Sequence, residues 1–259
     1  MKFLLKATLV FTLLCFFFDA SANPIKGRTT LSGEWKISER IKLEAGYEFR
    51  SKSSLCGVER HMLKSGMNYK FNQYLSMGVD YDFIAHYTSA SILQPRHRIG
   101  MNVIGTYDFG MWSLSLRERV QYTHKSYAVN GFQEPRNEMV LKTRLKLTYL
   151  GLNAFEPYTY VELRNTLNAP SFNATYQKDL GIYTDYSFTG YNDVYMNRLR
   201  GAIGIQWQVD KRNGLDLRVM LDYTTNKHIE TNPQGSVLEA YYIKKKWTPT
   251  IVVGYVFSF

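Results

Sequence analysis

After its first forty residues, the sequence repeats segments of roughly ten residues, the length of a tilted transmembrane strand, in which apolar and polar side chains alternate. The segment 75–87 is the most regular, because Val79, Tyr81 and Phe83 alternate with Asp80 and Asp82. Successive side chains of a β-strand point to opposite faces, so this period of two predicts strands with one apolar and one charged face. The mean hydropathy is −0.29, which suits a membrane protein only if its spanning elements are half polar, as barrel strands are.

The connections between these segments alternate between short and long. Tight turns with Asn, Asp or Gly are predicted at 38–40, 72–73, 108–110, 151–156 and 210–214. Longer polar loops are predicted at 51–57, 89–95, 127–135, 168–193 and 225–240. This sorting predicts an all-β fold, a transmembrane antiparallel β-barrel of about 10–12 strands with short periplasmic turns and long extracellular loops. A soluble sandwich or lipocalin-like barrel would bury the apolar face, and its loops would not sort by length.

The alternating pattern does not give the segment around Trp35 a definite place in the barrel. Strands counted from Ile41 to Phe259 number about ten, and residues 30–37 would add one more. Closed bacterial barrels have even strand numbers. We therefore expect this segment to lie outside the wall or to pair with a strand that the pattern does not reveal.

The first residues predict export. Lys2 and Lys6 flank an apolar run at 9–18, which is too short for a membrane helix, and the small residues 20–22 follow. We expect residues 1–22 to be a cleaved secretory signal peptide and residues 23–259 to form a single outer-membrane β-barrel domain of a Gram-negative bacterium. Cys56 would then be the only cysteine left, so no internal disulfide is expected. Export also makes nucleic acid an improbable partner for a chain of formal charge +10.

The end of the sequence supports the same location. Tyr255, Phe257 and Phe259 share one face of the last predicted strand, and other aromatic residues gather at both ends of the strands. Amphipathic rings favour the two membrane interfaces. We interpret the three residues as a membrane-insertion signal for the outer-membrane barrel assembly machinery, and outer-membrane lipid as the surrounding partner.

Several stretches resemble an uncharacterised (domain-of-unknown-function) family of small Gram-negative outer-membrane β-barrel proteins. They are residues 35–50, 117–119, 160–162, 198–223 and 254–259. The resemblance implies a barrel fold and a membrane location. It implies no established activity and no catalytic residues.

The polar faces would project charges of both signs into the lumen. The predicted lumen charge network comprises Arg50, Arg60, Asp80, Asp82, Arg96, Arg98, Arg117, Arg119, Arg144, Glu162, Arg164, Arg198, Arg200, Asp216, Arg218 and Asp222. A barrel of this size lies between one filled by side chains and one with an aqueous channel. The network therefore predicts a structural barrel with paired interior struts, or a narrow pore with anion preference from the arginine excess.

The alternative function is an outer-membrane enzyme that hydrolyses lipid or peptide at the outer rim. His86 shares a polar face with Asp82, but four residues along a strand separate them by roughly 13 Å. No nucleophile elbow, metal-binding cluster or phosphate loop is recognisable, so no catalytic residue, metal or cofactor is expected. Lys244, Lys245 and Lys246 would contact lipopolysaccharide phosphates or simply be solvated. The oligomeric state is left open.

Overall fold

The computed structural model describes residues 25–52, 55, 57–88 and 90–259. The predicted signal peptide, residues 1–22, and Cys56 lie outside the described residues. Within the described part, no helix is long and apolar enough to cross a membrane.

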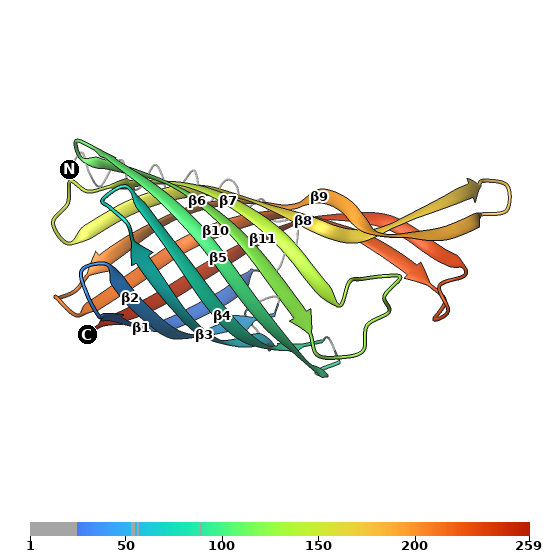
Figure 1. Cartoon of the computed structure of the whole chain (residues 1–259), viewed down its shortest axis with the longest axis horizontal. Helices are drawn as coiled ribbons and strands as arrows, with labels where there is room; N and C mark the ends of the chain where they lie inside the picture. Colours follow the sequence, from blue (N-terminus) through green and yellow to red (C-terminus); the bar gives the residue numbers. More distant parts are fainter. Residues whose placement is uncertain (1–24, 53–54, 56, 89) are drawn as a thin grey trace.

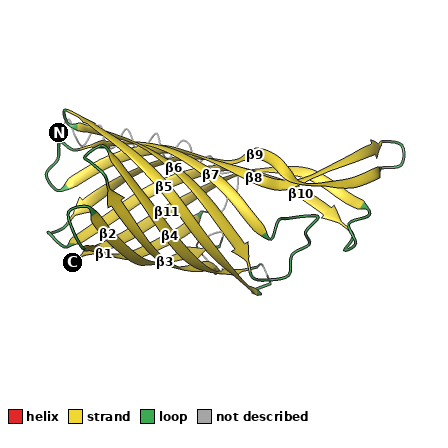
Figure 2. Ribbon diagram, viewed as in Figure 1, coloured by secondary structure: helices red, strands yellow, loops and turns green. Residues whose placement is uncertain are grey.

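Within the described residues, eleven strands form a closed barrel in which each strand pairs with its sequence neighbours and the first strand also pairs with the last (Figures 1 and 2). The strands are β1 (Lys26–Lys36), β2 (Ile41–Ser51), β3 (Val58–Lys70), β4 (Leu75–Tyr87), β5 (Leu93–Phe109), β6 (Trp112–Lys125), β7 (Asn137–Tyr149), β8 (Phe155–Gln177), β9 (Ile182–Gln208), β10 (Asn213–Thr231) and β11 (Leu238–Ser258). The predicted all-β barrel is confirmed, and eleven strands fall within the predicted range.

The expectation of an even strand number is wrong. The Trp35 segment belongs to the wall as β1, which pairs antiparallel with β2 and parallel with β11. The parallel register runs from Lys26 opposite Thr250 to Glu34 opposite Ser258. With an odd number of strands that otherwise alternate in direction, the first and last must run the same way, and a parallel ladder can still satisfy their backbone groups.

Two of the predicted long loops are mostly strand. Residues 168–193 form a hairpin in which β8 continues to Gln177 and β9 begins at Ile182, and residues 225–240 contain the paired ends of β10 and β11. The β8–β9 hairpin projects beyond the barrel (Figure 1). Its polar composition concealed the strands, because a segment outside the membrane needs no continuous apolar face.

The short turns lie at the opposite rim, and their local chemistry explains them. In the β9–β10 turn, the Asp210 carboxylate accepts hydrogen bonds from the backbone N–H groups of Arg212 (2.7 Å) and Asn213 (2.9 Å). These bonds favour the ionised carboxylate and lower its pKa. Gly110, with φ of 58°, supplies the left-handed residue of the β5–β6 turn.

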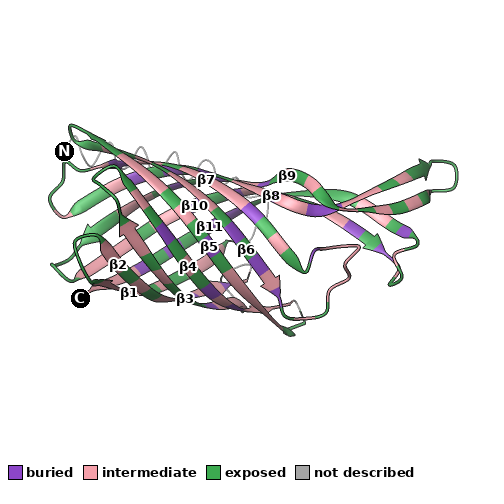
Figure 3. Ribbon diagram, viewed as in Figure 1, coloured by how far each residue is buried: buried purple, intermediate pink, exposed green. Residues whose placement is uncertain are grey.

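Exposed and less exposed residues alternate along the strands of the wall (Figure 3), and their identities are the reverse of those in a soluble protein. On β4, the carboxylate residue Asp82 is 4% exposed, whereas its apolar neighbours Val79 and Tyr81 are 44% and 41% exposed. Charged side chains are almost never buried in soluble proteins unless they are paired. The apolar residues of each strand therefore form the outer surface, and the charges face the interior.

Aromatic pairs lie at the rims. At the short-turn rim, Trp35 stacks on Phe259 with ring centroids 4.7 Å apart, and Phe257 contacts Phe259 edge to face. Tyr255 lies on the same outward face, and its hydroxyl bonds to Asn213. At the other end of the wall, Tyr223 packs on Trp247. The three residues of the predicted insertion signal thus belong to the seam between β1 and β11.

The Trp35–Phe259 stack is expected to stabilise this seam specifically. Replacing Trp35 by Ala removes a ring pair worth about 1 kcal/mol beyond its area burial, so hydrogen exchange of backbone amides in β1 and β11 should accelerate. Hydrogen–deuterium exchange with mass spectrometry measures this strand by strand. Trp112→Ala is the matched control, because Trp112 packs on Tyr149 between two antiparallel neighbours, β6 and β7. Equal acceleration of β1 and β11 exchange in both variants would contradict a role in closure.

Candidate functional site: the charged interior

The interior of the barrel holds a cavity of about 810 Å³ lined by side chains from β1 to β11. Fourteen of its lining residues are Arg or Lys, and eight are Asp or Glu. The sixteen residues predicted as a lumen network fall here, fifteen on the cavity wall and Asp222 bonded to Arg200 beside it. The period of two placed these side chains on one face, and closure of the sheet brings them around one space.

Glu162 on β8 is the centre of the largest ion-pair cluster. It is 1% exposed, and its carboxylate lies 3.1 Å from Arg117, 2.5 Å from Arg144, 3.0 Å from Arg198 and 3.6 Å from Arg200. These arginines come from β6, β7 and β9, so one acid ties together four strands of the wall. A buried carboxylate is stable only when it is paired and hydrogen-bonded in this way.

A second buried acid has the same role on the other side of the barrel. Glu48 on β2 is 2% exposed and pairs with Arg28, Arg50 and Lys64 from β1, β2 and β3. The Glu48 cluster thus joins the strand that closes the barrel to its neighbours.

The remaining predicted residues form smaller groups. Arg200 binds Asp222 with two hydrogen bonds of 2.5 and 2.8 Å, the bidentate geometry that suits a guanidinium. Other ion pairs between described members of the network are Arg119–Asp80, Arg119–Asp82, Arg98–Asp82 and Arg218–Asp216. Arg60 pairs with Glu59 and Arg164 with Glu138. Arg96 instead lies over the ring of Tyr127.

One side of the interior is apolar, which the sequence reading missed. Tyr158, Tyr160, Ala202, Met220 and Val252 form a buried cluster on the inner faces of β8 to β11. The Tyr158 hydroxyl donates a hydrogen bond to Asp216 at 2.5 Å. Apolar residues on an otherwise polar face, such as Met220 and Val252, were the signal for this filling. This buried cluster narrows the lumen on the side of β8 to β11.

The structure also places charged residues in the interior that the predicted network omitted. Seven such residues line the cavity: Arg28, Glu34, Glu44, Glu48, Lys64, Glu138 and Lys142. Arg28 was missed because β1 begins at Lys26, before the segment in which a strand was expected. Lys142 shares its polar face with Arg144 on β7, and this spacing could have identified it.

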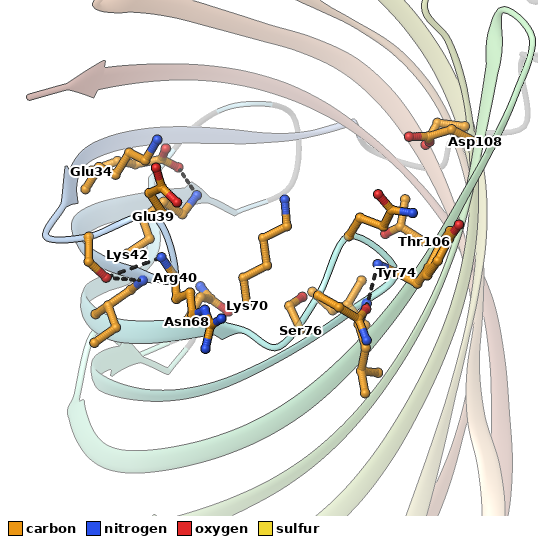
Figure 4. Close-up of a pocket in the computed structure, with 18 of the residues that line it drawn as sticks. Glu34, Glu39, Arg40, Lys42, Asn68, Lys70, Tyr74, Ser76, Thr106 and Asp108 are labelled. Atoms are coloured by element: carbon orange, nitrogen blue, oxygen red, sulfur yellow. Dashed lines mark hydrogen bonds and ion pairs between the residues drawn. The ribbon is translucent and has the colours of Figure 1, made fainter.

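A second cavity of about 830 Å³ opens at the short-turn rim (Figure 4). Glu34, Lys42 and Lys70 from β1, β2 and β3 project around it, and Glu34 and Lys42 pair at 3.1 Å. Glu34, Asn68 and Ile104 line both this cavity and the interior one. The two cavities are therefore neighbours along the barrel axis.

The residues considered for other roles lie elsewhere. His86 faces inward between Arg60 and Gln94 in the strand register, and its buried Nδ1 atom has no hydrogen-bond partner in the described part of the chain. Lys244 and Lys245 are exposed on β11, next to the half-buried Lys246. Among the described residues, no group of His, Cys, Asp and Glu could hold a metal ion.

Comparison with known proteins gives a family and distant structural likenesses. The sequence model described as "Protein of unknown function (DUF2490)" matches residues 28–232. No curated protein matches the sequence. The fold is similar to an anion-selective porin from Comamonas acidovorans, at 11% identity and a TM-score of 0.35, over 84% of this chain and 53% of that one. It is also similar to outer-membrane expressed OmpT of Vibrio cholerae, at 10% identity and a TM-score of 0.37, over 81% and 59%. The chain thus spans just over half the length of these two proteins.

Glu162→Gln should destabilise the barrel strongly, because it leaves four arginines around a neutral amide. Removing one partner of a buried ion pair costs about 3–5 kcal/mol, so the free energy of unfolding in urea should fall by this amount. Glu156→Gln, an exposed position on the same strand, is the control and should change the free energy by less than about 0.5 kcal/mol. Similar losses in the two variants would show that Glu162 does not organise the interior.

Proposed function

Because this chain belongs to the DUF2490 family of proteins of unknown function, we propose its function from the barrel itself: an outer-membrane protein whose interior is a narrow path that favours small anions. The outer surface supports a membrane location. Large apolar side chains such as Leu63, Val103 and Val161 are more than a third exposed on outward faces. A contiguous apolar surface of this extent suits lipid and would be costly in water.

The single observation that carries the anion preference is the charge of the cavity wall. Fourteen cationic side chains against eight acidic ones leave an excess of positive charge in a confined space with low-dielectric walls. Such a space concentrates counter-ions of the opposite sign and repels cations. The shared lining of the interior and short-turn cavities supports a continuous route, and the apolar cluster on β8 to β11 accounts for its narrowness.

The partners follow from the same location and are part of the proposal. Outer-membrane lipid would surround the wall, and the assembly machinery would recognise the strand that carries Tyr255, Phe257 and Phe259. Lys244 and Lys245 are exposed and have the charge to meet lipopolysaccharide phosphates at the outer leaflet.

The proposal predicts discrete single-channel conductance steps in a planar lipid bilayer. In a KCl gradient, the reversal potential should have the sign of chloride preference. The double variant Arg60→Gln/Arg98→Gln removes two cations from the cavity wall and should shift the reversal potential toward that of potassium, since anion preference follows the interior charge.

The control is the double variant Lys211→Gln/Arg212→Gln, which loses the same net charge from the exposed β9–β10 turn. Its reversal potential should equal that of the unmodified protein. Heat-modifiable gel mobility establishes that each variant is folded. A protein without conductance steps, or one that prefers potassium, would contradict the proposal.

A further inference from the structure

The strand register brings four cationic side chains into one row of the interior wall. Arg119 on β6 lies opposite Lys142 on β7, Lys142 opposite Arg164 on β8, and Arg164 opposite Arg198 on β9. Like charges directly opposite one another destabilise a sheet. A row of four cations without an acid therefore requires negative charge from outside the row to offset the repulsion.

The next row toward the short turns supplies only part of this negative charge, a single carboxylate. This row contains Arg117, Arg144, Glu162 and Arg200 on the same four strands. The two rows together, here named the basic patch, hold seven cations and one carboxylate. All eight side chains line the interior cavity.

The acids outside the basic patch leave it positive. Asp80 and Asp82 both pair with Arg119, Glu138 pairs with Arg164, and Asp222 pairs with Arg200. Glu162 is shared among Arg117, Arg144, Arg198 and Arg200. Five carboxylates thus face seven cations, and one of the five, Asp82, is shared with Arg98 outside the patch.

Among the cations of the basic patch, Lys142 most clearly lacks a partner that would neutralise its charge. Within the described residues, its ammonium group has neither a carboxylate within salt-bridge distance nor a hydrogen-bond acceptor, although it lies half-buried between Arg119 and Arg164. The buried Nε atoms of Arg117 and Arg198 have no acceptor either. Buried donors without an acceptor cost free energy that a bound anion would recover, and the same anion would neutralise the half-buried Lys142.

We infer that the basic patch is a binding site for a small multivalent oxyanion such as inorganic phosphate. The guanidinium forks can each bind two oxygens of a phosphate or carboxylate group, and Lys142 adds a point charge without displacing an existing partner. A monovalent halide offers a single centre and cannot satisfy these donors together. The inference rests on the proposed function for access, because the anion enters through the same interior cavity.

Isothermal titration calorimetry of the folded protein in zwitterionic detergent tests the site, with inorganic phosphate as the probe at constant ionic strength. Saturable binding of one phosphate per barrel is expected. Lys142→Met should weaken it about tenfold or more, the effect of losing one charge-assisted hydrogen bond. Lys142→Arg should retain it. A second titration with succinate in place of phosphate tests whether the site also accepts carboxylates. Binding of either anion that depends in the same way on Lys142 supports the inference.

Lys64→Met is the matched control, because Lys64 lines the same cavity but is bonded to Glu48. It should leave phosphate affinity within about twofold, since Lys64 lies on β3, outside the basic patch, and already donates a hydrogen bond to Glu48. Equal weakening by both substitutions, or no saturable binding of either anion, would overturn the site. Chloride selectivity in the bilayer without phosphate binding would reject the oxyanion site at the basic patch but not the proposed anion path. Phosphate binding without conductance would reject the proposed anion path but not the oxyanion site.

Discussion

Backbone amides that face hydrocarbon must find their partners within the protein, and the pairing of β1 with β11 completes that requirement for this barrel. Without it, two long strand edges would be left without hydrogen bonds. The seam is parallel, which gives slanted and slightly less stable pairing than the antiparallel ladders elsewhere. Additional contacts reinforce it: Trp35 stacks on Phe259, and the Glu48 cluster joins β1 to β2 and β3.

Closure also determines the chemistry of the interior. A wall that is apolar outside must place its polar faces inward, so charges of both signs meet in a confined space. Glu162 and Glu48 show how the fold accommodates them, because each buried carboxylate binds cations from several strands. The acids are too few for the arginines and lysines that face them. The resulting positive interior is the physical basis of the proposed anion path and of the inferred oxyanion site.

Much of the fold could be predicted from the sequence, because alternation over a whole strand is a strong signal. The segment 75–87 indicated which side chains face inward, and the structure places Asp80 and Asp82 in the cavity wall. The predictions failed where the alternation carried less information. The hairpin of β8 and β9 lies in a polar segment that was expected to be a loop. The Trp35 segment was left without a definite place in the wall, because an even number of strands was expected. Its parallel pairing with β11 instead closes a barrel with an odd number of strands.

The sequence by itself determined the period of two, and hence that this chain forms strands with one apolar and one charged face. Only the tertiary structure decided which charges are neighbours. A period of two assigns a residue to a face but says nothing of the position opposite it on the next strand, which depends on register. That register places Lys142 between Arg119 and Arg164, and gathers four arginines around Glu162. The pairing of residues more than a hundred positions apart, such as Trp35 with Phe259, likewise arises only when the sheet closes.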